Sequence, residues 1–340
     1  MGEFVVAGAT SVWIGTGADA GTVLAGASPR RVALLAQSGI PAVIAGRLGA
    51  GMPDAVVFEI PDGESAKTLG VVEEACRRLA SAGVERGDLL VGVGGGAATD
   101  LVGFVAAVFL RGIRVHYVAT TLVGAVDAAI GGKTAVNLEA KNQVGVFRHP
   151  SRVVIDTAVL AALPAPLRRA GLAEALKAGL VGDPGLVELL ERYGTDAPLA
   201  EVVERAIRVK AGIVERDFEE VGERAHLNYG HTIGHAIEVV AGISHGDAVA
   251  VGMVAAGRVS ALVAGFREED RQRAVIAALG LPVAVAGVEV SRVRALIARD
   301  KKRSSGGLRM VVLAEVGRPQ VVAVDDATVT AALTAVGIGG

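Results

Sequence analysis

The stretch VGVGGGAATD, residues 91–100, decides the fold class because it joins two kinds of secondary structure. Residues 89–94 are wholly apolar or glycine, as in a buried strand, whereas residues 99–112 carry apolar side chains at helical spacing. A strand that turns directly into a helix presents unpaired amide groups and a helix dipole, which favour an anion such as a pyrophosphate. The glycines do not follow the G-x-G-x-x-G spacing, so a tight turn without a ligand fits this stretch equally well.

Strand and helix patterns alternate on both sides of this turn. Runs rich in β-branched residues predict buried strands within residues 30–37, 55–61, 88–96, 113–121 and 151–157. Helical patterns lie between them, within residues 64–83 and 99–112. Strands separated by helices predict a parallel sheet that is covered on both faces.

After residue 160 the pattern is almost wholly helical, within residues 166–182, 198–217, 230–242 and 247–265. One exception, residues 308–324, predicts a late β-hairpin with Gly317 and Pro319 at its turn. A chain of 340 residues is long enough for two cores. We therefore predict an α/β N-terminal Rossmann-like domain with a parallel sheet, residues 1–158, and a mainly α-helical C-terminal domain, residues 159–340.

The composition excludes several classes of protein. No apolar run approaches the roughly 20 residues that a membrane span needs, and the N-terminus lacks a secretory or myristoylation signal. We therefore expect a cytoplasmic protein without a membrane partner. Acidic and basic residues are interspersed, with a net charge of -2, which argues against nucleic acid as a partner. Cys76 is the only cysteine, so neither an internal disulfide nor a cysteine-based metal site is expected.

Polar residues follow one of the predicted strands. PDGESAK, residues 61–67, presents Asp62, Glu64 and Lys67 directly after the strand within residues 55–61. Such groups suit a ribose or an amide at the carboxyl ends of parallel strands. Alternatively, Asp62 caps a helix and Glu64 favours its first turn.

A second polar segment is TTLVGAVDAAIGGKTAVNLEAKNQVG, residues 120–145. It interrupts apolar sequence with Asp127, Lys133, Asn137, Lys141 and Asn142. Lysine and asparagine on a glycine-rich loop can surround a phosphate, lysine as a point charge and the amides as orienting donors. A solvated loop with ordinary surface charges is the alternative.

The stretch HLNYGHTIGHAIEVV, residues 226–240, places His231 and His235 on one face of a helix. A lone pair of this spacing is more often incidental than a metal site. However, His245 follows, and Glu174 and Lys177 stand on another predicted helix of the same domain. Because a catalytic zinc uses three protein ligands and an open position, the third histidine and the carboxylate on otherwise apolar helices favour a metal site.

These motifs, in this order, resemble the 3-dehydroquinate synthase family. The resemblance spans about four fifths of the chain and rests on PDGESAK, GVGGGAATDLVGF, RGIRVHYVATTLVGAVDAAIGGKTAVN, KNQVG, GLAEALKAGL, LNYGHTIGHAIE, SHGDAVAVGM and RDKK. It implies a homodimeric phosphate lyase of the shikimate pathway of aromatic amino acid biosynthesis, with NAD and one divalent metal, Zn²⁺ or Co²⁺. Such an enzyme converts 3-deoxy-D-arabino-heptulosonate 7-phosphate to 3-dehydroquinate and phosphate by transient oxidation, phosphate elimination and aldol cyclisation.

The resemblance also implies roles for single residues. The metal ligands would be Glu174, His231 and His245. The catalytic and substrate-binding residues would be Asp127, Lys133, Asn142, Lys177, Arg224, Asn228 and His235, with Arg111 reaching the phosphate site of the partner subunit. The cofactor-binding residues would be Glu64, Lys67, Gly95, Gly96, Asp100, Thr120, Thr121, Lys141, Thr157 and Leu160. Either Lys301 or Lys302 would also face the substrate.

Two features depart from the family pattern, and two other functions stay open. Gln37 and Ser38 stand where many members have an acidic residue for the adenosine ribose, and Ala135 stands where glycine is usual. The first alternative is aminodehydroquinate synthase or another sugar phosphate cyclase of secondary metabolism, which neighbouring genes would discriminate. The second is a metal-dependent alcohol or glycerol dehydrogenase. This function would not explain why the chain contains the stretches GGKTAVN and KN.

Overall fold

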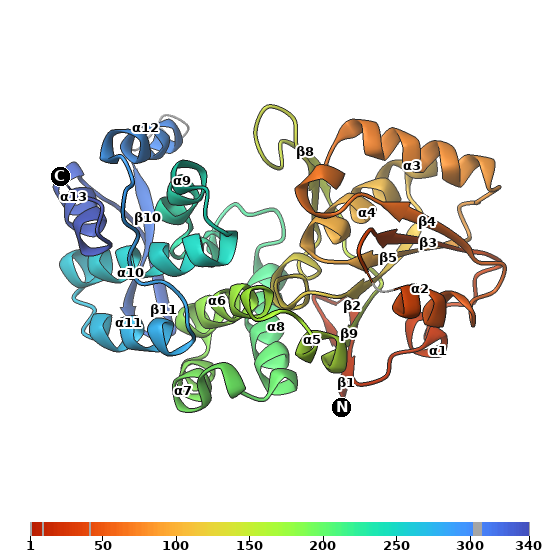
Figure 1. The fold of residues 1–340 in the computed structure, drawn as a ribbon, viewed down its shortest axis with the longest axis horizontal. Helices are drawn as coiled ribbons and strands as arrows, with labels where there is room; N and C mark the ends of the chain where they lie inside the picture. The colour runs from red at the N-terminus through yellow and green to blue at the C-terminus, as the bar shows by residue number, and fades with distance from the viewer. Residues whose placement is uncertain (1, 9, 41, 302–307, 340) are drawn as a thin grey trace. The chain divides into compact units, whose positions relative to one another are not determined.

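The computed structural model of the chain describes residues 2–8, 10–40, 42–301 and 308–339 (Figure 1). Its internal contacts divide it into two compact units, Met1–Pro164 and Ala165–Gly340, called here the N-terminal and C-terminal units. The boundary that the sequence predicted after residue 158 lies inside helix α5 (Thr157–Ala161).

The N-terminal unit is built on a seven-stranded sheet with the order β1-β2-β9-β6-β5-β3-β4. Its strands are β1 (Gly2–Val6), β2 (Thr10–Gly15), β3 (Val32–Gln37), β4 (Val56–Ile60), β5 (Leu89–Gly94), β6 (Arg114–Ala119) and β9 (Arg152–Asp156). All neighbouring pairs are parallel except β1 with β2. The five predicted strands are therefore confirmed, but the sheet is not purely parallel, because an unpredicted antiparallel hairpin forms its edge.

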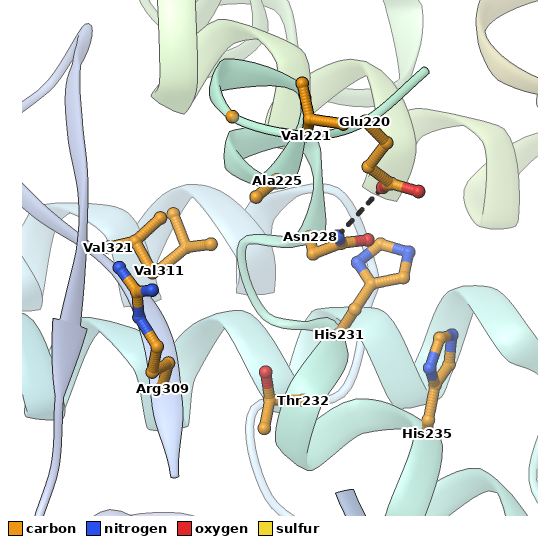
Figure 2. A pocket seen from close by; sticks show the side chains of 11 residues that line it. Glu220, Val221, Ala225, Asn228, His231, Thr232, His235, Arg309, Val311 and Val321 are labelled. Carbon is orange, nitrogen blue, oxygen red and sulfur yellow. Dashed lines mark hydrogen bonds between the residues drawn. The ribbon is translucent and has the colours of Figure 1, made fainter. Parts of the chain in front are cut away.

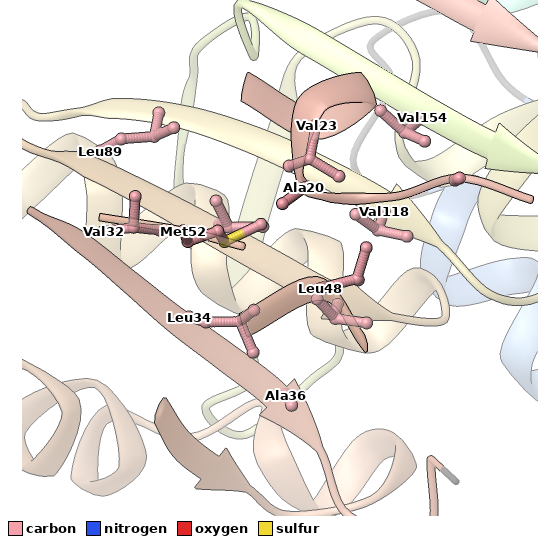
Figure 3. Packing of buried hydrophobic residues seen from close by; sticks show 13 residues of the cluster. Ala20, Val23, Val32, Leu34, Ala36, Leu48, Met52, Leu89, Val118 and Val154 are labelled. Atoms are coloured by element: carbon pink, nitrogen blue, oxygen red, sulfur yellow. The ribbon is translucent and has the colours of Figure 1, made fainter. Parts of the chain in front are cut away.

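Helices cover both faces of this sheet (Figure 1). On one face lie α1 (Ala20–Leu24) and α2 (Ala42–Gly49), and on the other lie α3 (Leu69–Ser81) and α4 (Gly96–Val108). Side chains of the first pair, such as Val23 and Leu48, pack on strand residues that include Leu34, Val118 and Val154 (Figure 3). Burying apolar side chains at roughly 25 cal/mol per Å² is the main force that holds these layers together.

Short elements connect the strands and helices of this unit. They are the 3-10 turns η1 (Gly63–Ala66) and η2 (Phe109–Arg111), the π-helical turn η3 (Gly124–Ala128), and the two-stranded ribbon of β7 (Lys133–Val136) and β8 (Val144–Phe147). Among them, η1 and η3 follow the carboxyl ends of β4 and β6. Most of the polar residues singled out in the N-terminal half lie on or beside these elements.

The C-terminal unit is mainly helical, as predicted. It consists of α6 (Ala165–Gly182), α7 (Pro184–Tyr193), η4 (Gly194–Asp196), α8 (Leu199–Arg216), η5 (Glu223–Asn228), α9 (His231–Ala241), α10 (His245–Ala264), α11 (Glu269–Ala278), α12 (Val290–Lys301) and α13 (Asp326–Ala335), with a hairpin between the last two. Helix α10 packs against α6, α9 and α13. Among the described residues it alone is long and apolar enough to cross a membrane, but 67% of that window is buried in the protein, as in a core helix.

The late hairpin forms where the sequence predicted it. Its strands are β10 (Arg309–Glu315) and β11 (Arg318–Ala323), and Gly317 lies between them with a positive φ of 84°. The predicted position of Pro319 is wrong, because this residue lies within β11, opposite Leu313. Proline is tolerated there because a two-stranded ribbon leaves an outer edge on which no amide donor is required.

Candidate active site

The carboxyl ends of β3 and β5 form the topological switch point of the N-terminal sheet. From β3 the chain continues to β4 on one side, whereas from β5 it continues to β6 on the other. Open α/β sheets bind ligands at such a point because the connections diverge there. The glycine-rich turn lies here, with Gly95 as the N-cap of α4, and no side chain caps this helix. Its first amide groups therefore keep the donor capacity that a pyrophosphate would use.

Gln37 links the strand ends at this switch point. Its Oε1 accepts a hydrogen bond of 2.9 Å from the amide of Gly95, and its Nε2 donates to Asp62, which follows β4. The position at which an acidic residue was expected is thus occupied by an amide that both donates and accepts within the protein.

Lys67 joins η1 to α4 and to the loop between β7 and β8. The residue is only 3% exposed, and its ammonium group donates to Asp100 Oδ2 and to Asn142 Oδ1, both at 2.5 Å. Glu64 Oε2 accepts a hydrogen bond of 2.8 Å from Asn137 Nδ2 in the same loop. Asn142 adopts φ = 58°, a left-handed conformation that asparagine tolerates better than most residues. Residues predicted separately for NAD and for the substrate therefore belong to one hydrogen-bonded network.

The remaining cofactor residues predicted in this unit lie around β6 and β9. Thr120 donates its amide to Gly94, and the hydroxyl of Thr121 accepts from the amide of Gly124, so both threonines stand beside the glycine-rich turn. Thr157 donates its hydroxyl to a backbone carbonyl, and Leu160 is fully buried. These last two residues have structural roles, and their contact with a cofactor stays a prediction.

The predicted substrate residues of this unit lie on the connecting elements. Asp127 is half-buried in η3, whereas Lys133 and Lys141 are exposed on the ribbon of β7 and β8. Ala135 lies in β7 opposite a glycine of β8. Arg111 is exposed and has a left-handed φ of 63°, a conformation that is unusual outside glycine and is often found at functional positions.

In the C-terminal unit, Glu174 on α6 lies between two histidines. Its Oε1 is 3.1 Å from His245 Nε2 and 3.5 Å from His231 Nε2, and ligand atoms of the three residues all lie within 4.8 Å of one another. Glu174 is 1% exposed. Lys177 Nζ is 2.6 Å from its Oε2, yet within the described part of the chain no donor reaches Oε2 in hydrogen-bond geometry. A buried carboxylate must be compensated by opposite charge or by hydrogen bonds, and a bound cation would add to the compensation that Lys177 provides.

The Nδ1 atoms of His231 and His245 each lie within hydrogen-bond distance of an oxygen of the protein. His231 Nδ1 lies 3.2 Å from the carbonyl oxygen of Tyr229, and His245 Nδ1 lies 3.0 Å from Glu238 Oε2. Metal-binding histidines usually donate one ring N–H to a carbonyl or carboxylate, which leaves the other nitrogen for the metal. Both Nε2 atoms face Glu174, so the three side chains fit a divalent metal with an open position.

The charges of this cluster also fit a cation. Burial raises the pKa of Glu174, but Lys177 and His231 outweigh this effect and hold the pKa well below its usual range. Burial lowers the pKa of His245, but hydrogen bonds to Glu174 and Glu238 outweigh it and raise the pKa to about 10. The carboxylate is therefore already ionised, and metal binding would displace a proton from His245.

Helix α9 begins at His231 because the residue before it is glycine. Gly230 adopts φ = 80°, and a Cβ at this position would lie 2.8 Å from the amide nitrogen of Met253 on α10. Only glycine fits this turn without displacing α10. The close approach of the two helices brings His231 and His245 to a ring separation of 5.6 Å.

A cavity of about 470 Å³ opens beside this cluster in the C-terminal unit (Figure 2). Its polar lining comes from Glu220, Asn228, His231, Thr232, His235 and Arg309. Asn228 and the two histidines were predicted as site residues, and Glu220, Thr232 and Arg309 were not. Glu220 stands among other charged residues, and Arg309 lies in the predicted hairpin, where a polar side chain on the solvated face is ordinary, so the local sequence singled out neither of these two.

Other predicted residues of this unit lie elsewhere or outside the described side chains. Arg224 is 1% exposed and donates to the carbonyl of Phe218, so its contact with the substrate stays a prediction. Lys301 ends α12 but its side chain, like all of Lys302, lies outside the described residues. Glu238 was missed, although its spacing of seven residues from His231 places it on the same helical face.

The sequence matches the model of the 3-dehydroquinate synthase N-terminal domain over residues 57–169 and that of the C-terminal domain over residues 171–303. It is 43% identical to the 3-dehydroquinate synthase of Thermobifida fusca, with 79% of this chain and 76% of that protein covered. For the enzyme of Cutibacterium acnes the identity is 45%, with 74% of each covered. The chain belongs to the 3-dehydroquinate synthase family.

Solved structures agree with membership of the 3-dehydroquinate synthase family. 2-Deoxy-scyllo-inosose synthase, complexed with carbaglucose-6-phosphate, NAD⁺ and Co²⁺, is 26% identical, with a TM-score of 0.86 over 94% of this chain and 95% of that chain. ValA, a 2-epi-5-epi-valiolone synthase from Streptomyces hygroscopicus with NAD⁺ and Zn²⁺ bound, is 28% identical, with a TM-score of 0.85 over 96% of each chain. A probable glycerol dehydrogenase from Sinorhizobium meliloti, at 19% identity and a TM-score of 0.65, covering 95% of each chain, shares the fold alone. The predicted family and fold class are confirmed.

Proposed function

We propose that the chain is a 3-dehydroquinate synthase, which converts 3-deoxy-D-arabino-heptulosonate 7-phosphate to 3-dehydroquinate and phosphate in the shikimate pathway. The observation that carries this proposal is the convergence of Glu174, His231 and His245 in a chain whose two halves match both domains of the family. The enzyme is an NAD- and metal-dependent phosphate lyase that works in the cytoplasm as a homodimer.

The metal would be held by Glu174, His231 and His245. When bound, Zn²⁺ or Co²⁺ would supply a Lewis acid for the oxygen of the substrate hydroxyl whose carbon is oxidised and later reduced. Lys177, 4% exposed and 2.6 Å from Glu174 Oε2, stabilises the ionised carboxylate. The related cyclases described above, one with Co²⁺ and the other with Zn²⁺, support either ion.

His235 is the proton-transfer residue in this proposal. Its ring lies 5.0 Å from that of His231 and lines the same cavity, but it is exposed and does not belong to the group around Glu174. A histidine beside a substrate hydroxyl exchanges protons near neutral pH. Asn228, which donates to Glu220 at 3.4 Å on the cavity wall, would orient the substrate as a donor and acceptor.

NAD would bind at the switch point, with its pyrophosphate at the N-terminus of α4 beside Gly95 and Gly96. When bound, NAD supplies a hydride acceptor that is regenerated in each turnover. Lys67 holds Asp100 and Asn142 together, which orders the loop between β7 and β8 against α4. The remaining cofactor contacts are proposed at Glu64, Thr120, Thr121, Lys141, Thr157 and Leu160.

The substrate phosphate would be held by the residues of the ribbon and its neighbours. Lys133, Lys141 and Asn142 offer two point charges and an amide, which suit a phosphate that must be held and then released. Asp127, Arg224 and the partner-directed Arg111 complete the proposed substrate contacts. If Arg111 serves the other subunit, dimerisation is a requirement for activity.

The test follows phosphate release and the absorbance of reduced cofactor together, on the heptulosonate phosphate and on its amino analogue. One phosphate per turnover, with no net NADH and catalytic NAD sufficient for many turnovers, is expected. Net NADH formation without phosphate release would show that the chain is an alcohol dehydrogenase and not a cyclase. A clear preference for the amino analogue would keep the chemistry but assign the chain to aminodehydroquinate synthesis.

A further inference from the structure

We propose that Glu238 is a positioning residue for the metal site, because it holds the ring of His245 in the orientation and tautomer that present Nε2 to Glu174. The inference rests on the proposed metal site and deepens it. Glu238 belongs to α9, and its Oε2 lies 3.0 Å from His245 Nδ1. The ring of His245 is therefore held between two carboxylates that come from different helices, Glu174 on α6 and Glu238 on α9.

The place of His245 in the fold explains why it needs such a support. It is the first residue of α10, and its side chain is 38% exposed, so packing alone does not restrict its rotation. A hydrogen bond from Nδ1 to a carboxylate fixes both torsions of the side chain at once. It also places the ring proton on Nδ1, which leaves the lone pair of Nε2 for a metal.

The other histidine ligand is supported differently. The side chain of His231 is 11% exposed, and its Nδ1 faces a neutral acceptor, the carbonyl of Tyr229, at 3.2 Å. Tyr229 is itself fully buried and donates its hydroxyl to Gln272 at 2.8 Å. Packing thus restrains His231, whereas the more exposed His245 depends on a charged acceptor. A carboxylate acceptor also makes the imidazole a stronger metal ligand than a carbonyl does.

Direct ligation by Glu238 is the competing role. Ligand atoms of His235, Glu238 and His245 also lie within 4.8 Å of one another, so a metal bound there would use Glu238 itself. The geometry favours the positioning role for two reasons. Oε1 of the buried Glu174 faces the Nε2 atoms of both His231 and His245. The group that includes Glu238 instead relies on His235, which is exposed.

The experiment compares Glu238→Ala, Glu238→Gln and Glu174→Ala with the wild type. Glu188→Gln serves as the matched control, since Glu188 is exposed on α7 and the change in charge is the same. Zinc stoichiometry and affinity are measured by competition with a chromophoric chelator. The tautomer of His245 in the zinc-loaded protein is read from the ¹⁵N chemical shifts of its ring, and circular dichroism checks the fold of each metal-free variant.

We expect Glu238→Ala to bind one zinc with affinity about 10- to 100-fold below wild type, and with a mixture of His245 tautomers. Glu238→Gln should lose less affinity, because its amide oxygen still accepts from Nδ1. Glu188→Gln should match the wild type. Glu174→Ala should lose stoichiometric zinc.

Two results would overturn the positioning role. Wild-type affinity and a single tautomer in Glu238→Ala would mean that His245 is held by other contacts. Loss of stoichiometric zinc in both Glu238 variants would make Glu238 a ligand. Retention of wild-type zinc affinity by Glu174→Ala is a separate outcome, which would remove the proposed metal site itself and the inference with it.

Discussion

Nε2 of His245 lies 3.1 Å from Oε1 of Glu174, although the two residues stand 71 positions apart in the chain. The contact depends on how closely α6 and α10 approach. Gly246 follows His245 directly, and a Cβ at this position would lie 2.3 Å from Cα of Ala170 on α6. The absence of a side chain at residue 246 therefore sets the distance at which the histidine meets the carboxylate.

Gly246→Ala should consequently separate α6 from α10 and disturb the metal site. Because the clash is with backbone, we expect a loss of about 1–3 kcal/mol of stability and a weaker affinity for zinc. Gly212→Ala on α8 is the control, since its Cβ would meet only the end of a flexible arginine at 3.6 Å. Thermal unfolding and chelator competition measure both effects. Equal behaviour of the two variants would refute the spacing role of Gly246.

The two histidines of α9 should separate into a ligand and a proton-transfer residue. His231→Ala should lower metal affinity by more than about 100-fold. Loss of a residue that only supports a ligand lowers metal affinity by at most about 100-fold, so a larger loss indicates a ligand. His235→Ala should retain one metal, while turnover falls about 10²- to 10⁴-fold. Metal analysis and phosphate release distinguish the two. Equal loss of metal in both variants would mean that His231 and His235 do not have these separate roles.

Lys67→Met should destabilise the N-terminal unit, because it leaves the carboxylate of Asp100 without its buried partner. Removing one partner of a buried ion pair usually lowers the free energy of unfolding by about 3–5 kcal/mol. We expect about 3 kcal/mol here, because the side chain of Asp100 is 19% exposed. Arg77→Met, which breaks an exposed pair with Glu73, should cost no more than about 0.5 kcal/mol. Urea unfolding followed by the fluorescence of Trp13, the only tryptophan, reports on this unit. A cost for Lys67→Met no larger than that of the control would show that the network adds nothing to stability.

His116 should make the N-terminal unit sensitive to acid. Burial lowers its pKa from the ordinary 6.5 to about 4, although the ring is hydrogen-bonded to the carbonyl of Val23 at 2.8 Å. The folded state thus keeps His116 neutral, while the unfolded chain takes up a proton below pH 6.5. The stability contributed by the neutral ring is present above that pH and is lost as pH falls, by about 2 kcal/mol between pH 6.5 and 5.

His116→Asn retains a donor for Val23 but cannot be protonated, so its unfolding midpoint should change less between pH 6.5 and 5. The comparison uses the difference between the two pH values in each protein, because the smaller side chain also lowers stability at every pH. Parallel pH profiles for wild type and variant would contradict this origin of acid sensitivity.

Much of the fold followed from local patterns. Runs such as residues 30–37 and 151–157 predicted strands because continuous β-branched sequence suits a strand that is buried on both faces. Helices such as α6 and α10 followed from their spacing of apolar residues. The N-terminal hairpin did not, because an edge pair that is half solvated lacks the continuous apolar run that marked the other strands.

The sequence by itself determined most of the elements and, through its motifs, the family, because these depend on residue types and on spacing along the chain. The resemblance to that family implied the candidate ligands Glu174, His231 and His245. Only the tertiary structure decided that the Nε2 atoms converge on one buried oxygen, that Glu238 supports His245, and that Gln37 joins the ends of β3 and β5. Such contacts depend on how helices and strands distant in sequence pack, and that packing is set by close approaches such as that of Gly246 to α6, which no local pattern encodes.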